Sequence, residues 1–317
     1  MRVKVATFNL ENLFNRYAFL DTPWNGRDYE KFVQAIGVVS IASRQGDLVS
    51  YSITEIQRNN TAQAIIEATP DVLAVEEVEN LHTLRIFNDT YLDNYFDRML
   101  LINGNDPRDI NVGFLVKRGF PGEILNIRTH IDDGVKNRSS ARNMGYLANG
   151  GVFSRDCLEI DMMLNGCIIT FMINHFKAQD KTKKSVERRK LQASTVAALV
   201  EKAVKDGKKP VVLGDLNMDP RHPVFRGDDS LLPLLSSPYL NDPFPVDTWT
   251  HYYVPDKKTS RLDYILVDKG ITVVGTAVIY KGLTTKCQVY TGERYSTIGQ
   301  EHTEASDHCP TVVTLEI

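Results

Sequence analysis

Cysteine is scarce in this sequence of 317 residues. The four cysteines are Cys157, Cys167, Cys287 and Cys309, and none forms a CxxC pair. His308 stands next to Cys309, but no second Cys/His pair follows at zinc spacing, so we expect no zinc site built on cysteine. We interpret the cysteines as buried or half-buried free thiols, with a Cys157–Cys167 contact across a hairpin as the alternative.

Long apolar runs are also absent. No stretch approaches the roughly 20 apolar residues that a membrane-spanning helix needs. The chain runs directly into MRVKVATFNL, without the apolar region and cleavage site of a secretory signal peptide. We therefore expect no membrane span and a cytoplasmic location, unless an export signal has been removed.

An excess of charge of either sign is lacking as well. The sequence has 37 Lys and Arg against 40 Asp and Glu, a formal net charge of -3, and a pI of about 6.2. Many modules that bind duplex nucleic acid are basic overall, so this balance argues against tight non-specific binding. A nuclease stays open, because a local basic rim and a bound metal can offset an acidic site.

What the sequence does contain is a repeated alternation of strand and helix patterns. Thr54 and Gln57 form a capping box that begins a helix, and Asn165-Gly166 between two apolar runs predicts a hairpin. Strands are predicted over residues 2–8, 71–75, 112–116, 157–164, 167–173, 210–213, 262–267, 271–279 and 309–317. Helices are predicted over residues 54–68, 81–92 and 188–205, and loops over 15–53, 129–150 and the proline-rich 219–260.

This pattern predicts an α/β fold. Strand–helix–strand units recur in both halves and are mixed with a hairpin, which favours a sandwich of two packed mixed sheets covered by helices. Hydrophobic residues make up 42% of the chain, which is typical of a soluble globular protein, and no break in composition marks a linker. We therefore expect a single domain over residues 1–317.

Polar residues follow the apolar strands again and again. Those at predicted strand ends are Asn9, Glu11, Glu76, Glu77, Asn174, His175, Asp215, Asn217, Asp307 and His308, and Asp263 lies inside a strand. Each alone has an ordinary explanation, such as a cap, a loop residue or an internal ion pair. Together they are rich in oxygen ligands and almost free of lysine, which suits Mg²⁺, Mn²⁺ or Ca²⁺. Phosphoryl transfer needs such a cation, an activated water and a donor to the leaving oxygen.

Six motifs carry a family resemblance. They are TFNLEN (7–12), LAVEEVEN (73–80), INHFKAQ (173–179), VVLGDLNMDP (211–220), RLDYILV (261–267) and SDHCP (306–310). In this order they resemble the endonuclease/exonuclease/phosphatase superfamily, which includes deoxyribonuclease I-like nucleases, inositol-polyphosphate 5-phosphatases and neutral sphingomyelinases. The resemblance covers essentially the whole chain. It implies a four-layer α/β/β/α sandwich and a phosphoric ester hydrolase that uses Mg²⁺ or Mn²⁺, with Ca²⁺ as a further candidate.

The resemblance also implies a metal site. Asn9 and Glu77 match the pair at the metal, with Glu77 as the principal ligand. Glu11 falls where some members place a metal-binding acid, although a glutamate leaving a strand can simply cap a loop. Asp307 matches another acid near the metal, and Glu76 is interpreted as a neighbour of the ligands.

The expected catalytic groups follow in the same way. Asp215 matches the residue that orients or activates water, and Asn217 resembles the asparagine that contacts the scissile phosphate. His308 matches the histidine that binds this phosphate and takes part in acid/base work. Asp263 resembles the carboxylate that pairs with this histidine, which would raise its pKa. His175 matches a second histidine, a candidate acid for the leaving group.

Two residues are candidates for contacts with substrate. Arg155 resembles a phosphate-contacting arginine, against the ordinary reading of a surface arginine in a hairpin. Trp249 falls where members often place an aromatic residue near the substrate, against a place in the core.

The sequence leaves more than one class of substrate open. NHFKAQ, RRKLQA and GDLN resemble bacterial extracellular-type nucleases most closely, and the basic stretch 177–190 could grip the phosphates of a nucleic acid. This favours a DNA or RNA nuclease. The alternatives are a phosphatase or phosphodiesterase acting on a small phosphorylated molecule or a lipid headgroup, and a catalytically inactive binding module, against which the intact set of acids and histidines argues. Nothing in the sequence indicates an oligomeric state.

Overall fold

The computed structural model describes most of the chain. The described residues are 1–13, 16–20, 40–41, 47–50, 54–106, 110–135, 151–180, 182–221, 227–300 and 302–317. The predicted loops 15–53 and 129–150 therefore lie largely outside them. Within the first loop the described strands β3, β2 and β4 pair in that order (Ser40–Ile41, Arg16–Leu20 and Asp47–Ser50).

Two mixed sheets of six strands form the centre of the molecule. The first has the order β16 (Thr272–Val278), β17 (Thr311–Glu316), β1 (Arg2–Leu13), β5 (Val72–Val78), β7 (Asn111–Lys117) and β6 (Phe96–Leu101). The second has the order β12 (Leu240–Asn241), β15 (Asp263–Asp268), β11 (Lys209–Asp215), β10 (Cys167–His175), β9 (Cys157–Leu164) and β8 (Glu123–Arg128). A separate pair joins β13 (His251–Tyr253) to β14 (Lys258–Ser260).

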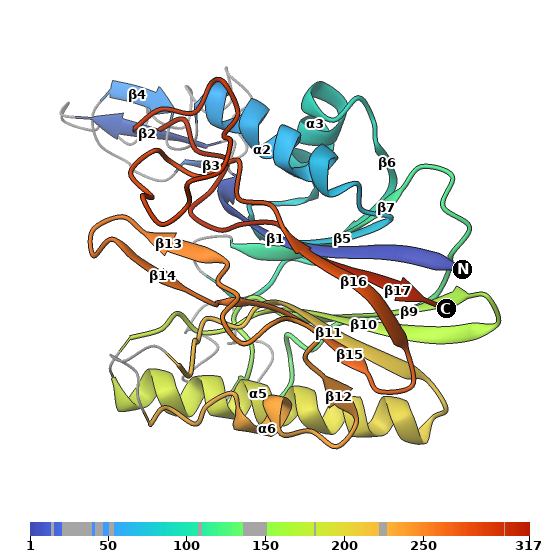
Figure 1. Cartoon of the computed structure of the whole chain (residues 1–317). Helices are drawn as coiled ribbons and strands as arrows, with labels where there is room; N and C mark the ends of the chain where they lie inside the picture. Colours follow the sequence, from blue (N-terminus) through green and yellow to red (C-terminus); the bar gives the residue numbers. More distant parts are fainter. Residues whose placement is uncertain are drawn as a thin grey trace, which may run out of the picture.

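Helices cover both outer faces of the packed sheets, giving four layers (Figure 1). Helices α2 (Glu55–Ala68) and α3 (Leu81–Tyr91) cover the first sheet. Helices α5 (Lys183–Lys205) and α6 (Leu232–Leu235) cover the second. The predicted α/β/β/α sandwich is confirmed. Among the described residues no helix has both the length and the apolar character needed to cross a membrane.

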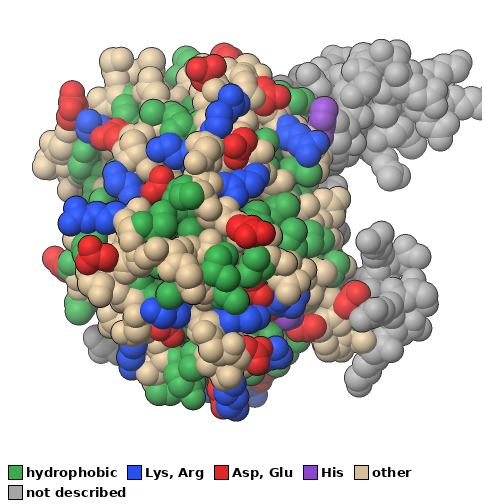
Figure 2. All heavy atoms as spheres, turned by 90° about the vertical axis from the view of Figure 1, so that its right-hand side faces the viewer, with side chains coloured by type: hydrophobic (Ala, Val, Ile, Leu, Met, Phe, Trp, Pro, Cys, Tyr) green, Lys and Arg blue, Asp and Glu red, His purple; other side chains and the backbone are tan. Residues whose placement is uncertain are grey.

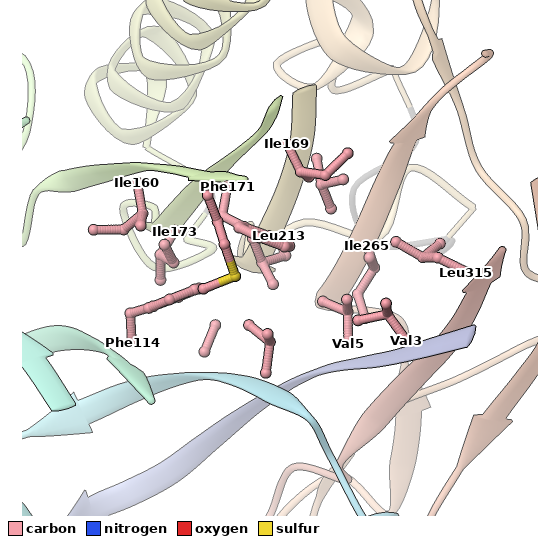
Figure 3. Close-up of a cluster of buried hydrophobic side chains, with 14 of the residues drawn as sticks. Val3, Val5, Phe114, Ile160, Ile169, Phe171, Ile173, Leu213, Ile265 and Leu315 are labelled. Carbon is pink, nitrogen blue, oxygen red and sulfur yellow. The ribbon is translucent and has the colours of Figure 1, made fainter. Parts of the chain in front are cut away.

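The main core fills the space between the two sheets (Figure 3). Phe114 of β7 packs against Phe171 of β10, with ring centroids 5.3 Å apart. Val5 of β1 and Ile265 of β15 join the same cluster, and neither is exposed to solvent. Full burial of each such side chain contributes about 1.5–3 kcal/mol to the free energy of folding. This apolar layer therefore fixes the position of one sheet against the other, and with it the relative position of the strand ends that carry the site.

Local sequence signals account for several boundaries. Thr54 accepts a hydrogen bond from the backbone N–H of Gln57, and the Gln57 side chain accepts one from the backbone N–H of Thr54, so the predicted capping box is confirmed. Asn165 and Gly166 adopt φ values of 48° and 80°, the left-handed pair that a tight hairpin turn needs. This hairpin places Cys157 opposite Asn174 and Cys167 opposite Leu164, so the two cysteines do not meet and all four remain free thiols.

Three predictions of local structure need correction. Strands β6 and β8 were not predicted, because they are edge strands with mostly exposed or half-buried side chains and lack a clear apolar alternation. Helix α5 begins at Lys183 rather than Arg188, since Thr182 caps it and its first turn is polar. Segment 219–260 is not all loop, for it contains α6, β12, β13 and β14, with a proline in the first turn of α6 where it costs no hydrogen bond.

Candidate active site

The candidate residues meet at one edge of the sandwich, away from the chain termini (Figure 1). In the first sheet β1 runs parallel to β5 and Asn9 pairs with Glu76 in register. In the second sheet β10 runs parallel to β11 and His175 pairs with Asp215. The antiparallel strands β15 and β17 begin where these strands end, with Asp263 in register opposite Asp215. Carboxyl ends of parallel strands are where α/β folds form clefts.

Asp215 lies at the centre of the group and is 1% exposed. Its Oδ2 accepts hydrogen bonds from Asn9 Nδ2 at 3.1 Å and from Asn217 Nδ2 at 2.8 Å. Oδ1 accepts the backbone N–H of Asn217 at 2.8 Å, and His175 Nε2 lies 3.5 Å from Oδ2. Burial raises the pKa of Asp215 to about 7, against the opposing charge of His308. The carboxyl is therefore poised to exchange a proton near neutral pH.

His308 is paired with a buried carboxylate. Its Nδ1 lies 2.8 Å from Asp263 Oδ2, which also accepts a hydrogen bond from Thr250 Oγ1 at 2.6 Å. Burial lowers the pKa of His308, but the charge and hydrogen bond of Asp263 outweigh it, so the net pKa lies well above its ordinary value. Because Nδ1 faces Asp263, Nε2 faces Asp215 and Asp307, at 4.0 and 3.9 Å. His308 is thus a cation whose free N–H points into the acidic group.

Glu11, Glu77 and Asp307 place further carboxylates beside this pair. Burial raises the pKa of Glu11, and the charge of Asp307 adds to the effect. Burial and then Asp307 raise the pKa of Glu77 as well. Asp307 is the exception: burial opposes its ionisation, but the hydrogen bond from His251 and the charge of His308 hold its pKa at about 2. Negative charge is concentrated here beyond what the neighbouring cations balance.

The backbone at three of these residues is unusual. Glu11, Glu77 and Asn217 have φ values of 46°, 60° and 55°, in the left-handed region that residues other than glycine rarely adopt. Glu11 and Glu77 lie where the register of β1 with β5 shifts, between the Asn9–Glu76 and Leu13–Val78 pairs. Such conformations cost about 1–3 kcal/mol each and gather at functional sites.

A cation fits this donor set. Hard divalent ions bind carboxylate and amide oxygens, and those of Asn9, Glu11, Glu77 and Asp307 lie at one strand edge, where burial and then the charge of Asp307 raise the pKa of both glutamates. Among the described residues, two groups have ligand atoms close enough to share an ion: Asp215, Asp263 and His308, and His251, Asp307 and His308. Both groups include His308, whose Nδ1 already faces Asp263.

His251 is a member of the site that the sequence did not reveal. Its Nε2 lies 3.5 Å from Asp307 Oδ2, its Nδ1 lies 3.0 Å from Ser260 Oγ, and its ring is 4.7 Å from that of His308. It stands in a segment interpreted as loop, so no strand-end pattern singled it out. Its one signal was its position directly after Thr250, two residues from Trp249.

Glu76 lies beneath the site. Its side chain is fully buried and accepts a hydrogen bond from Thr7 Oγ1 at 2.9 Å. Burial and the charge of Asp263 raise its pKa well above the ordinary range. Its interpretation as a neighbour of the metal ligands stays a prediction.

The two candidate substrate contacts differ in their surroundings. Arg155 is only 5% exposed, with Nε 3.0 Å from Asp106 Oδ2 and Nη1 donating to the carbonyl of Phe176 at 3.0 Å. It is therefore not a surface arginine, and its charge acts on Glu77. Trp249 is half-buried and packs against Tyr280, with ring centroids 4.4 Å apart and an interplanar angle of 36°, in a cluster that includes Cys309.

The basic stretch after His175 is only partly available to a ligand. Arg189 is fully buried and pairs with Asp228 at 2.7 Å, so it holds loops together. Lys190 pairs with Asp229 at 2.5 Å. Lys177 and Lys183 have side chains that are 40% and 89% exposed, and they form looser pairs with Asp180 at 4.0 Å and Glu187 at 3.7 Å.

Comparisons with known proteins agree with this geometry. The model of the endonuclease/exonuclease/phosphatase family matches residues 54–308. No protein of curated function matches the sequence at a significant level. Among solved structures, one from Bacteroides vulgatus, described as an endonuclease/exonuclease/phosphatase, is 15% identical with a TM-score of 0.60, and the match covers 100% of this chain and 99% of that one.

Two further structures are similar over their full length. A mannosyl-6-phosphatase from Bacteroides thetaiotaomicron is 17% identical with a TM-score of 0.58, covering 99% of this chain and 100% of that one. Truncated TDP2 from Caenorhabditis elegans is 13% identical with a TM-score of 0.59, covering 100% of this chain and 98% of that one. At these identities the likeness shows the fold alone.

Proposed function

Because this chain belongs to the endonuclease/exonuclease/phosphatase family, whose members hydrolyse phosphoric esters, we propose that it is a divalent-metal-dependent phosphodiesterase that cleaves DNA or RNA. We assign the activity to one domain over residues 1–317. The observation that carries the proposal is the meeting of the His308–Asp263 pair with Asp215 and the strand-end carboxylates at a single edge.

The cation of this family supplies charge neutralisation of the phosphate and a lowered pKa of a bound water. Glu77 would be its principal ligand, with Asn9, Glu11 and Asp307 beside it. We infer Mg²⁺ first and Mn²⁺ second, since the donors are oxygens, with Ca²⁺ as a further candidate.

The protein's own groups divide the rest of the chemistry. Asp215 would orient the attacking water and accept its proton, because its Oδ2 is held by Asn9 and Asn217 and its pKa is about 7. The Nε2–H of His308 would donate to a phosphate oxygen while Asp263 accepts the Nδ1–H and orients the ring. Asn217 would add a neutral donor to the charge that develops on that phosphate.

His175 would act on the leaving oxygen. Its Nε2 lies 3.8 Å from Glu77 Oε1 and 3.5 Å from Asp215 Oδ2. Arg155 would hold the phosphate through its charge, and Trp249 would border the substrate. The likeness to bacterial extracellular-type nucleases stays a prediction.

A nuclease is preferred over a phosphomonoesterase because exposed lysines lie directly after His175. Lys177 begins this stretch, and Asn217 contacts the carbonyl of the intervening Phe176. Cations in a row beside a hydrolytic centre suit a polymer of phosphates. The second candidate, a phosphatase for a small phosphorylated molecule, has one observation in its favour, the similar fold of a mannosyl-6-phosphatase.

The test is hydrolysis of supercoiled plasmid, single-stranded DNA and RNA by purified protein, with Mg²⁺, Mn²⁺ or EDTA, beside His308→Ala. We expect cleavage with metal, none with EDTA, and none by the variant. EDTA-resistant cleavage would remove the metal from the mechanism. If folded protein cleaves no polymer, the nuclease proposal is wrong, and a screen of sugar phosphates and lipid headgroups then tests the second candidate.

A further inference from the structure

A cavity of about 420 Å³ opens directly beside the candidate metal ligands. Glu11 and Asp307 line one end of it, together with Ser306, whose hydroxyl donates to the Asn9 carbonyl at 2.8 Å. A phosphate held by His308 and the cation would therefore stand at the mouth of this cavity. Whatever group is attached to that phosphate has room to extend into it.

One wall of the cavity is aromatic and apolar. Tyr253 is 49% exposed, and its ring lies nearly parallel to that of His251, with centroids 6.4 Å apart and an interplanar angle of 22°. Tyr252 is buried behind it and donates its hydroxyl to the Lys286 carbonyl at 2.8 Å, which fixes the floor. Leu283 adds apolar surface. An exposed aromatic face on a fixed base is a platform for stacking.

The opposite rim is polar but carries no surplus of positive charge. Gln300 presents an exposed amide, and its carbonyl is held by Thr284 Oγ1 at 2.8 Å. The charged side chains of the lining are one lysine, Lys286, and three acids, Glu11, Glu304 and Asp307, and His302 is also part of it. Because the acids outnumber the single lysine, the lining disfavours a second phosphate and favours an occupant that is neutral, planar and able to form hydrogen bonds.

We propose that this cavity holds the nucleobase of the nucleotide attached to the scissile phosphate, stacked on Tyr253 with its polar edge toward Gln300. The inference rests on the proposed function, because that function places the phosphate at the mouth. A sugar would form a hydrogen bond with the amide of Gln300 but gain little from the ring of Tyr253. A lipid headgroup has no planar group to stack on that ring. The base is the neutral planar group that nucleic acid offers.

The test compares two ligands that differ only in the base, thymidine 5′-monophosphate and 2-deoxyribose 5-phosphate. Their Kd values are measured by titration calorimetry with Mg²⁺ in the full chain carrying Asp215→Asn, which prevents turnover. We expect the base to improve affinity about tenfold or more, as stacking on an aromatic side chain does. Adding Tyr253→Ala should remove that advantage, whereas Tyr253→Phe should keep it.

Gln300→Ala provides the second arm. It should lower the preference about threefold, the loss of one exposed hydrogen bond, while Gln288→Ala, an exposed glutamine of the same segment outside the cavity, should leave it unchanged. Equal affinity for the two ligands, or a preference that survives Tyr253→Ala, overturns the inference. A preference abolished by Tyr253→Ala alongside inactivity on every polymer would instead overturn the nuclease proposal and leave the base site standing.

Discussion

The two ends of the parallel strands β1 and β5 carry charge in opposite ways. Where the strands begin, Asp71 accepts the backbone N–H of Lys4 at 2.9 Å and lies 3.8 Å from Lys117, and Lys4 donates to Thr69 at 2.6 Å. The face on the side of the chain termini mixes acidic and basic side chains (Figure 2). Where the same strands end, carboxylates gather around one charged histidine, and burial raises the pKa of most of them.

The difference separates what the fold needs from what the chemistry needs. Opposite charges at the first end balance each other in solvent and contribute little, about 0–1 kcal/mol per exposed pair. The carboxyl groups that gather at the second end lower the stability of the fold, and strand pairing does not require them. A matched substitution at each end therefore distinguishes a catalytic arrangement from an ordinary one.

The largest contrast should come from Asp215→Asn and His308→Ala against Asp71→Asn. Each of the first two should lower the rate of phosphodiester hydrolysis by about 10³-fold or more. Asp215→Asn removes the group that accepts the proton of water, and His308→Ala removes the group that donates a hydrogen bond to the phosphate. Asp71→Asn should keep nearly full activity. Turnover is measured at saturating Mg²⁺, with circular dichroism to check folding. Near-normal turnover in either folded site variant would contradict the assignment.

Asn217→Ala should have the next largest effect, about 10²-fold in kcat, because a neutral donor to the developing charge is lost. KM should change much less, since the interaction strengthens in the transition state. Asn126→Ala, at an exposed asparagine on β8, serves as the control. A rise in KM with unchanged kcat would show that Asn217 only binds the substrate.

His251→Asn should lower activity about tenfold, the usual cost of losing a group that orients a metal ligand. His251 acts through Asp307, so the variant should also need more Mg²⁺ for half-maximal activity. His82→Asn, an exposed histidine on α3, should change neither quantity. An unchanged Mg²⁺ requirement would remove His251 from the site.

The smallest effect concerns the stability of metal-free protein. Burial raises the pKa of Asp215 to about 7, far above its unfolded value of about 3.9. Between these values the folded state binds more protons than the unfolded chain, so this carboxyl makes stability fall as the pH rises toward 7.

Urea unfolding in EDTA measures this dependence. From about pH 5 to pH 7 the wild type should lose about 1–2 kcal/mol more than Asp215→Asn, an effect of one pKa unit or more. Asp71→Asn should follow the wild type. Parallel curves for wild type and Asp215→Asn would mean that the surroundings of this buried carboxyl do not raise its pKa.

How much the sequence predicted follows from where each signal lies. Strand ends with polar residues, such as Asn9 and Asp215, stood out because a buried apolar run precedes each of them. The capping box at Thr54 and the turn at Asn165 were readable because their chemistry is local. His251 was not, because its partner Asp307 is distant in sequence and only the pairing of His251 with His308 brings them together.

The remaining differences have the same origin. Edge strands β6 and β8 expose much of their surface and so lack an apolar alternation. The sequence left a surface position open as the alternative for Arg155, since nothing local indicates the buried Asp106 that lies 3.0 Å away. Both depend on three-dimensional neighbours rather than on periodicity.

The left-handed backbone of Glu11 and Glu77 has an evolutionary consequence. Glycine adopts this conformation without a steric penalty, so a glycine at either position should make the protein more resistant to heat while removing a proposed metal ligand. Under selection for stability alone, substitutions would therefore replace these two glutamates before they replaced residues of the core. A descendant that is more stable to heat but has lost catalysis should keep both sheets intact. Its first substitutions should be at Glu11 and Glu77.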